Sequence, residues 1–176
     1  MTTNISEEIK LRPLETSDNN QIALLANNIK IWNNVRDLMP YPYSLKDADE
    51  FIEFCTNEEP TTTFAIVYKG ELTGLIGLTL QRDVYRLTAE VGYWLGEPYW
   101  NKGITSKALK LILEYGFAKF DLIKIYAGVF EYNKASQRVL EKTGFKLEGV
   151  LKKSVIKNNV ICDEYRYGLL KELYIV

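Results

Sequence analysis

The chain has 176 residues, of which 47% are hydrophobic and 26% are charged, and its formal net charge is -1. This length and composition suit one compact globular domain and exclude a disordered or fibrous chain. The balanced charge provides no sequence-wide basic field for nucleic acid or an anionic membrane. The absence of histidine excludes Ser-His-Asp triads, Cys-His dyads and histidine-ligated zinc. Any proton transfer must therefore use carboxylate, tyrosine, serine, lysine, cysteine or water.

The two cysteines, Cys55 and Cys162, are too far apart in the sequence for a CxxC motif. We expect buried, reduced thiols, with a disulfide as the alternative. No apolar run approaches the roughly 18 residues that a membrane span needs, and the first residues contain no apolar signal-peptide core. We therefore expect a cytoplasmic protein, and we expect no metal site.

The first quarter of the chain contains signals for one strand and two helices. Residues 9–14 alternate apolar and polar side chains, which indicates a strand. Residues 17–18 can cap a helix that includes residues 22–29. Ser44 and Asp47 have capping-box spacing ahead of an apolar helical stripe, which predicts a second helix.

Three β-rich segments follow, at residues 64–68, 72–81 and 87–95. Short turns join them, so they predict an antiparallel meander. Apolar residues then recur at helical spacing between residues 103 and 120, which indicates an amphipathic helix.

The last third of the chain alternates strand and helix signals. Residues 123–130 indicate a strand, and a helix is expected from Asn133 to a terminating Gly144. Asn158 and Asn159 are typical of a hairpin turn between two final strands. The whole order, β-α-α-β-β-β-α-β-α-β-β, predicts an α+β fold with a mixed sheet. No repeat or linker divides the sequence, so we expect one domain over residues 1–176.

The strongest local signal for chemistry is the strand, glycine-containing turn and helix between residues 92 and 112. Backbone N–H groups from Asn101 to Ser106 would lie at the positive end of the helix dipole, where they could bind a pyrophosphate. The segment contains neither a P-loop nor a GxGxxG motif. In the alternative interpretation, Gly103 merely permits the turn.

A second candidate group consists of Asn133 and Ser136, followed by Arg138. Taken alone, Asn133 can be a helix cap, Ser136 a first-turn residue and Arg138 part of a solvated face. Both interpretations stay open on the sequence pattern.

Together, the two groups resemble the acyl-CoA-binding core of the GNAT acetyltransferase superfamily, in particular its RimJ/RimL-like branch of ribosomal-protein N-terminal acetyltransferases. The resemblance covers residues 90–145 and is carried by AEVGYWLGEPYWNKGITSKAL, KIYAGVF and EYNKASQRVLEKTGF. It extends more weakly over the whole chain through IKLRPLETSD, MPYPYSLKDADEFI and NNVICDEYRYGLL. It implies the acyl-CoA N-acyltransferase fold, in which helices flank a central, mixed and mostly antiparallel β-sheet.

The resemblance implies that acetyl-CoA is the acyl-donor cosubstrate. The phosphate loop departs from the superfamily pattern at two positions, because Trp100 occupies its first position and Thr105 its last, where Gly or Ala is usual. The residues that the resemblance assigns to the cosubstrate are Tyr93, Trp94, Leu95, Asn101, Lys102, Gly103, Ile104, Thr105, Ser106, Asn133, Ser136 and Arg138.

Two residues are candidates for catalysis. The resemblance places Glu90 on the strand beside the thioester, where it would accept the amine proton through water. Leu140 occupies the position of a tyrosine that protonates the departing thiolate in many superfamily members, so Ser136 remains as hydrogen-bond donor to that sulfur. In the alternative interpretation, Glu90 is a strand-surface residue paired with a Lys or Arg.

The implied activity is direct acetyl transfer from acetyl-CoA to a primary amine. A protein α-amine has a pKa of about 7.7–8.0 against about 10.4 for lysine, so a weak base favours an N-terminal acceptor. Trp32, Tyr41 and Tyr43 could form an acceptor wall, or could simply pack under the proline-rich loop. The alternatives are a small-molecule acceptor (amino acid, polyamine or antibiotic) and a non-catalytic acyl-CoA-binding module. Monomer and homodimer stay open as assembly states.

Overall fold

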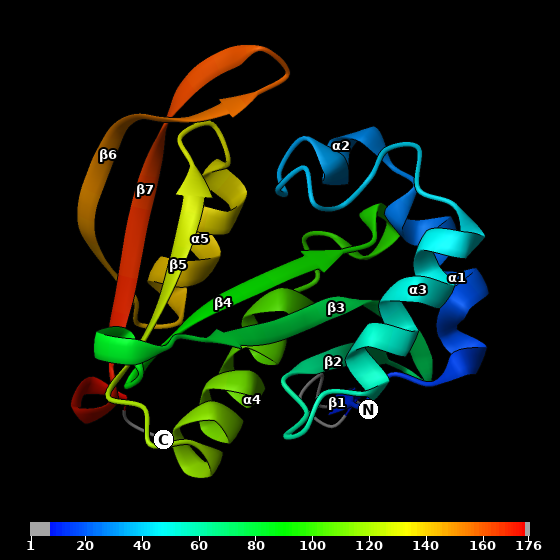
Figure 1. The fold of residues 1–176 in the computed structure, drawn as a ribbon, viewed down its shortest axis with the longest axis horizontal. Coiled ribbons are helices and arrows are strands. Elements are labelled where there is room, and N and C mark those ends of the chain that lie inside the picture. Colours follow the sequence, from blue (N-terminus) through cyan, green and yellow to red (C-terminus); the bar gives the residue numbers. More distant parts are fainter. Residues whose placement is uncertain (1–7, 175–176) are drawn as a thin grey trace, which may run out of the picture. The chain divides into compact units, whose positions relative to one another are not determined.

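A computed structural model describes residues 8–174, and within them seven strands form one sheet in the order β1-β2-β3-β4-β5-β7-β6. Figure 1 colours the chain along this sequence. The pairs β1–β2, β2–β3, β5–β7 and β6–β7 are antiparallel, whereas β4–β5 is parallel. The predicted α+β class, with a mixed and mostly antiparallel sheet, is therefore confirmed. The strands are β1 Ile9–Arg12, β2 Thr63–Tyr68, β3 Glu71–Leu80, β4 Thr88–Leu95, β5 Lys124–Phe130, β6 Lys146–Lys157 and β7 Val160–Leu170.

Five α-helices and four 3-10 turns are formed in the described part of the chain. Each α-helix matches a sequence signal except the one-turn α2, which the apolar periodicity did not predict. The helices are α1 Asn19–Ala26, α2 Ile29–Trp32, α3 Leu45–Thr56, α4 Ile104–Lys119 and α5 Lys134–Lys142. The 3-10 turns are η2 Thr16–Asp18, η3 Asp83–Tyr85, η4 Glu97–Tyr99 and η5 Lys171–Leu173.

The chain divides into two compact units. Unit 1 comprises Met1–Gly77 with Tyr93–Leu111, and unit 2 comprises Leu78–Gly92 with Ile112–Val176. Strands β3 and β4 and helix α4 each continue from one unit into the other. The expectation of one acetyltransferase domain over residues 1–176 stays a prediction.

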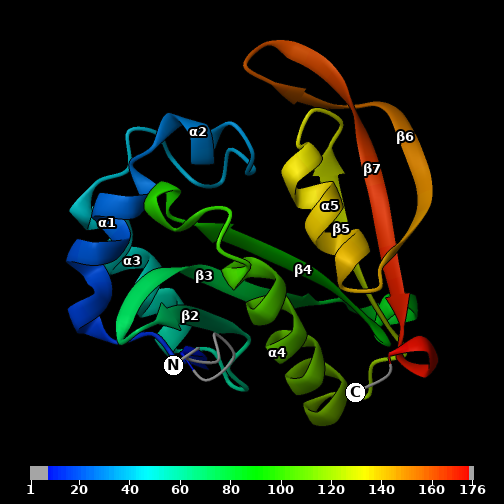
Figure 2. The same ribbon diagram turned by 180° about the vertical axis from the view of Figure 1, so that it is seen from behind.

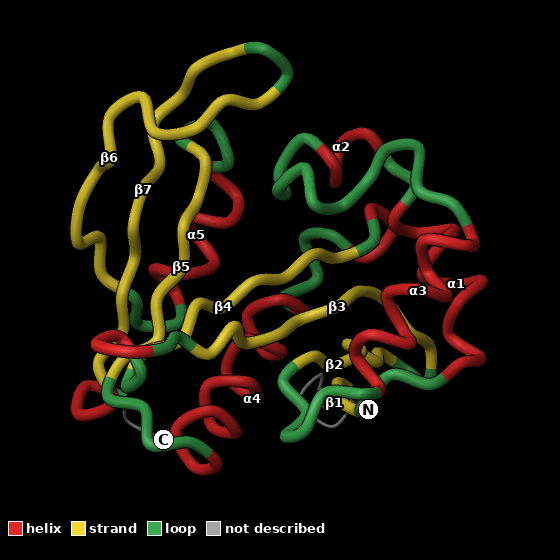
Figure 3. Tube along the Cα trace, viewed as in Figure 1, coloured by secondary structure: helices red, strands yellow, loops and turns green. Residues whose placement is uncertain are grey.

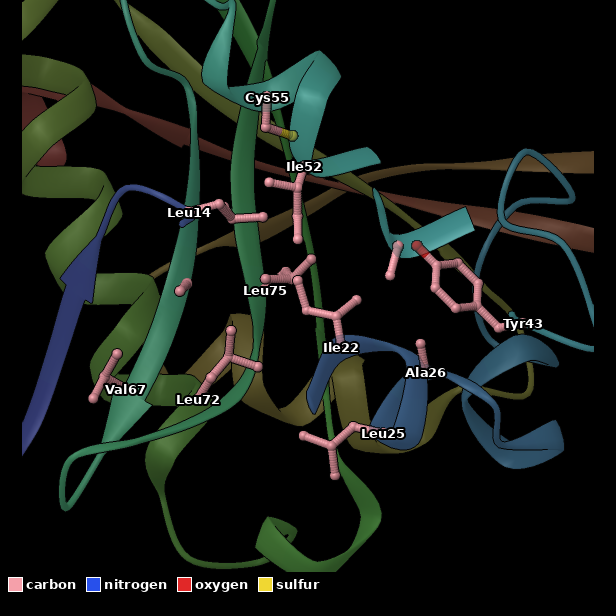
Figure 4. Packing of buried hydrophobic residues seen from close by; sticks show 12 residues of the cluster. Leu14, Ile22, Leu25, Ala26, Tyr43, Ile52, Cys55, Val67, Leu72 and Leu75 are labelled. Carbon is pink, nitrogen blue, oxygen red and sulfur yellow. The ribbon is translucent and has the colours of Figure 1, made fainter. Parts of the chain in front are cut away.

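Unit 1 has a core in which α1 and α3 bury their apolar stripes against β2 and β3. Ile22 and Leu25 of α1 lie with Leu72 and Leu75 in one cluster of buried side chains, to which α3 adds Ile52 (Figure 4). Burying a side chain of this size contributes about 1.5–3 kcal/mol, so the cluster supplies much of the stability of unit 1.

In unit 2 the helices cover one face of the sheet (Figure 2). The hydroxyl of Tyr167 in β7 donates to the Glu141 carboxylate of α5 at 3.0 Å, and Lys134 of α5 lies over the Tyr165 ring. Gly116 of α4 lies close to Ile125 of β5. The β5 side chains alternate strictly between buried and half-buried, so only one face of this strand enters the core. Figure 3 shows the long hairpin of β6 and β7 beside β5.

Several short sequence motifs correctly predicted where a helix or a turn begins or ends. Ser44 and Asp47 form the expected capping box at the start of α3. Asn158 and Asn159 both have positive φ, at 52° and 61°, as the predicted hairpin turn requires. Gly144 ends α5 with φ 96°. Both cysteines are buried and unbridged, as expected.

The expected N-terminal elements differ from the structure at their ends. The strand expected over residues 9–14 ends at Arg12, because Pro13 has no N–H to donate to the sheet. The helix expected to include residues 22–29 starts earlier and ends at Ala26. Asn28 then accepts a hydrogen bond from the Lys30 N–H and starts α2. Over the described range each helix is too short or too polar to cross a lipid bilayer.

Candidate functional site

The turn between β4 and α4 in unit 1 has the backbone geometry of an anion-binding loop. Two of its residues, Asn101 and Gly103, adopt left-handed backbone conformations, with φ of 59° and 74°. Left-handed residues that alternate with right-handed ones, as Asn101 and Gly103 do around Lys102, turn backbone N–H groups toward a common point. The indole N–H of Trp100 donates to the Leu95 carbonyl at 2.7 Å, which ties the turn to the strand before it. Trp100 at the first loop position therefore has a structural role.

Helix α4 begins directly after this turn. Its first residue, Ile104, is 1% exposed, so the helix begins with a fully buried side chain. The Lys107 N–H donates to the Gly103 carbonyl, so the N–H groups of Ile104, Thr105 and Ser106 have no acceptor within the helix. These groups lie at the positive end of the helix dipole and could bind phosphate. Thr105 is part of the helix and half-buried, so the fold itself accommodates its side chain.

The start of the turn is held by residues that the sequence analysis did not select. Glu97 of η4 accepts hydrogen bonds from the Asn28 amide, at 2.8 Å, and from the Lys30 ammonium. These hydrogen bonds, that from Lys30 above all, lower the pKa of the Glu97 carboxyl. Lys102 lies with its ammonium 5.6 Å from the centre of the Tyr99 ring. The Glu97 contacts connect residues far apart in the sequence, so no local pattern could have revealed them.

The three strand residues assigned to the thioester, Tyr93, Trp94 and Leu95, lie in unit 1 at the end of β4. Leu95 is buried, whereas Tyr93 and Trp94 are half-buried. Gly74 of β3 is required here, because a Cβ atom at that position would come within 2.3 Å of the Trp94 carbonyl oxygen. The backbone of β4 therefore lies closely against β3 at this point.

Glu90 lies in the part of β4 that belongs to unit 2. The parallel register of β4 and β5 comprises three residue pairs, and the last joins Glu90 to Tyr126. Both strands continue beyond this point, so Glu90 is the last β4 residue that pairs with β5. Its side chain is half-buried, on the face opposite the buried Ala89 and Val91. A carboxylate in this position is accessible to water, as proton transfer through a water molecule requires.

Asn133 and Ser136 adopt the geometry of a helix cap in unit 2. The Asn133 side-chain oxygen accepts a hydrogen bond from the Ser136 N–H at 3.0 Å, which starts α5. Ser136 is half-buried and Arg138 is exposed. Leu140 is fully buried and packs in the core. The cap confirms the structural interpretation of Asn133, and it also fixes Ser136 in the first turn of α5.

Three aromatic residues of unit 1 are expected near the acceptor. Trp32 and Tyr41 form a pair, whereas Tyr43 lies in the core. The rings of Trp32 and Tyr41 lie 5.6 Å apart, and the Trp32 indole N–H donates to the Met39 carbonyl. Tyr43 is 8% exposed and belongs to the buried cluster. Burial, with the nearby Asp47 charge, raises the pKa of Tyr43 to about 12. Only Trp32 and Tyr41 therefore stay candidates for an acceptor surface.

The predicted site residues fall into two groups according to unit. Unit 1 contains the aromatic pair, the end of β4 and the turn before α4, whereas unit 2 contains Glu90, Asn133, Ser136 and Arg138. Between residues 8 and 174, no group of three or more His, Cys, Asp or Glu side chains could hold a metal ion.

Residues 8–146 match the Acetyltransferase (GNAT) domain family. A spermidine N(1)-acetyltransferase of Escherichia coli (strain K12) is 27% identical over 171 residues, which cover 97% of this chain and 90% of that protein.

Among solved structures, the microcin C7 self-immunity acetyltransferase MccE, in complex with acetyl-CoA and AMP, is 28% identical. It has a TM-score of 0.80, and the likeness covers 93% of each chain. RimL, the ribosomal L7/L12 α-N-protein acetyltransferase in complex with coenzyme A, shares the fold with a TM-score of 0.82 at 19% identity, over 95% of this chain and 96% of that one. This chain therefore belongs to the GNAT acetyltransferase family and is an N-acetyltransferase that uses acetyl-CoA as its cosubstrate.

Proposed function

We propose that the chain acetylates the N-terminal α-amine of a protein or peptide, as the RimJ/RimL-like branch of the family does. The observation that carries this proposal is the nature of the available base. The chain contains no histidine, and the predicted base is the half-buried carboxylate of Glu90. A carboxylate is a weak base. An α-amine, with a pKa of about 7.7–8.0, loses its proton more easily than a lysine side chain and therefore requires the weakest base.

In the proposed reaction, the neutral amine attacks the thioester carbonyl carbon, the carbon–sulfur bond breaks and CoA leaves as its thiolate. Glu90 takes up the amine proton through water. The Ser136 hydroxyl donates a hydrogen bond to the departing sulfur, because Leu140 is buried and carries no acid. The backbone of Tyr93–Leu95 would polarise the carbonyl oxygen.

The phosphates of the cosubstrate would bind to the turn before α4. Its left-handed residues, Asn101 and Gly103, and the helix N–H groups from Ile104 to Ser106 support this assignment. Asn101, Lys102 and Gly103 are exposed, so an anion can reach them from solvent. The paired rings of Trp32 and Tyr41 would contact the acceptor backbone.

A polyamine is the second candidate acceptor, since the Escherichia coli spermidine N(1)-acetyltransferase aligns with nearly the whole chain. An acceptor panel separates the two candidates. CoA release is measured with a peptide that has a free α-amine, with the same peptide blocked at its N-terminus but containing lysine, and with spermidine. Mass spectrometry then locates the acetyl group.

We expect turnover with the free α-amine, and at most slow turnover with the blocked peptide. Preference for spermidine over every α-amine peptide would refute the proposed acceptor and leave the chemistry intact. Acetyl-CoA binding without turnover on any amine would show a non-catalytic acyl-CoA-binding module.

A further inference from the structure

The face of the sheet in unit 2 that carries Glu90 also carries a set of charged side chains to which the family motifs assign no role. Tyr126 is the register partner of Glu90 in β5. Register also pairs Gly128 of β5 with Arg166 of β7. Because side chains alternate along a strand, Tyr126, Gly128 and Arg166 share the face of Glu90. We refer to this face of unit 2 as the polar face.

The packing on the polar face directs Arg166 toward Tyr126. Gly128 has no side chain, and the Glu164 carboxylate occupies the space above it, 2.9–3.0 Å from where a Cβ atom would lie. Glu164 holds the Arg166 guanidinium through hydrogen bonds of 3.1 Å from Nε and 2.6 Å from Nη2. The guanidinium lies over the Tyr126 ring, with Cζ 4.7 Å from the ring centre.

This geometry brings the positive charge of Arg166 toward Glu90. Strands β4 and β7 flank β5, so their axes lie about 9.6 Å apart, and Arg166 lies two residues along the sheet from the level of Glu90 and Tyr126. An arginine that reaches over the Tyr126 ring crosses much of this distance. Burial tends to lower the pKa of Arg166, but the hydrogen bond to Glu164 and, in decreasing order, the charges of Glu164, Tyr126 and Glu90 raise it overall.

We infer that Arg166 is a positioning residue for Glu90: stacked on Tyr126 and held by Glu164, it directs a positive charge across β5 toward the Glu90 carboxylate. The catalytic consequence of this inference rests on the proposed role of Glu90. Glu164 weakens the interaction between Arg166 and Glu90, because both carboxylates attract the same guanidinium.

Lys124 of β5 also lies on the polar face, two residues before Tyr126, and the Glu148 carboxylate occupies the space above Gly168, the register partner of Tyr126. Lys124 of β5 pairs with Glu148 of β6 at 2.6 Å, and Lys152 of β6 pairs with Asp163 of β7 at 2.7 Å. Strand β3, the other neighbour of β4, has no titratable side chain between Leu72 and Leu80. The turn before β4 carries the exposed residues Asp83, Tyr85 and Arg86, next to Arg82.

The first test is the pH profile of kcat at saturating acceptor peptide. Arg166→Met removes the cation but keeps an apolar stem, so the acid limb should move to higher pH by about 0.2–0.7 unit, the range expected for exposed charge pairs. Glu164→Gln should move it in the opposite direction, because Arg166 loses its competing partner. Arg166→Lys should restore most of the wild-type profile. Lys152→Met removes a cation from the same hairpin and serves as the control that leaves the limb in place.

The second test separates this inference from the proposed function. Urea unfolding of the wild type, Glu90→Gln, Arg166→Met and the double variant needs no acceptor. Contact between the two charges predicts that Arg166→Met lowers the urea midpoint less in the Glu90→Gln background. Equal losses in both backgrounds would overturn the inference.

The same four proteins are also compared by kcat and its pH profile. In the Glu90→Gln background, Arg166→Met should cause no further change in kcat or in its pH profile. An acid limb that moves equally in Arg166→Met and Lys152→Met would also overturn the inference, since any lost cation would then suffice. If Glu90→Gln itself leaves kcat unchanged at every pH, the proposed base is wrong, while the unfolding cycle still decides whether the charges interact.

Discussion

Replacing Gly103 with alanine tests the cosubstrate loop, because the structure separates two effects of the added methyl group. Gly103 has φ 74°, a conformation that costs an L-residue about 1–2 kcal/mol. Among the described residues, and apart from Gly103 itself and its two chain neighbours, no atom lies within 4 Å of the position that the new Cβ would take. The variant therefore bears a backbone penalty without a clash inside the protein. Alanine is a cleaner choice than valine, whose branched Cβ adds strain of its own.

Gly70 provides a matched control. It lies in the turn between β2 and β3 and has φ 88°. Its chain neighbours aside, no atom in the described part of the chain lies within 4 Å of the position that an added Cβ would take. Gly70→Ala should therefore lose about the same unfolding free energy, about 1–2 kcal/mol. Urea unfolding of both variants measures this loss directly.

Only Gly103→Ala should weaken binding of CoA, because its methyl group would stand where the pyrophosphate approaches the backbone. A hydrogen bond to a charged group contributes about 1.5–3 kcal/mol, so the loss of one such bond would raise Kd about 10- to 150-fold. Isothermal titration calorimetry with CoA measures Kd for the wild type and both variants. An unchanged Kd in folded Gly103→Ala, or an equal increase in Gly70→Ala, would refute the assignment of this loop to the phosphates.

Three further predictions concern single side chains. Ser136→Ala should lower kcat more than it raises KM for acetyl-CoA, since the hydroxyl acts on the departing sulfur; equal kcat values would leave Ser136 a purely structural residue. Glu90→Gln should lower kcat/KM about 10²–10⁴-fold at low pH, and the loss should shrink as pH approaches the pKa of the acceptor; a small, pH-independent loss argues against a base. Asp18→Asn should cost about 2 kcal/mol of unfolding free energy at neutral pH, because Asp18 accepts two 2.7 Å hydrogen bonds from Arg12.

The pH dependence of the Asp18 effect has a definite sign. Burial alone would raise the pKa of Asp18, but hydrogen bonds from Arg12 and from the Glu15 N–H lower it overall. The charged form therefore stabilises the fold at neutral pH, and this contribution is lost as pH falls from about 4 through the lowered pKa. Urea midpoints of wild type and Asp18→Asn should accordingly converge in acid. A difference that persists unchanged would assign the loss to packing.

The sequence predicted those parts of the fold that depend on neighbouring residues. Ser44 and Asp47 satisfy each other's backbone N–H groups within one helical turn, so their spacing alone predicts the start of α3. Asn158 and Asn159 tolerate positive φ and therefore mark the hairpin. The same reasoning located the turn before α4, whose Gly103 has the required conformation.

Features that depend on distant residues escaped prediction. The contact of Glu97 with Asn28 and Lys30 requires the folded arrangement of unit 1. For Tyr43 the sequence leaves open an acceptor wall or packing under the proline-rich loop, and the structure places its ring in the core. The contacts of Arg166 with Glu164 and Tyr126 depend on the register between β5 and β7, which the sequence of β7 alone does not specify.

The proposed roles of Glu90 and Arg166 constrain the choice of acceptor. A carboxylate that faces a cation is a weaker base than an isolated carboxylate, so a site of this kind has less power to remove a proton from an amine. An amine with a pKa of about 10.4 is almost wholly protonated at neutral pH and would require the stronger base. An α-amine supplies a substantial neutral fraction by itself and needs Glu90 only to carry the proton away. A carboxylate held beside an arginine is thus better suited to N-terminal amines than to lysine side chains.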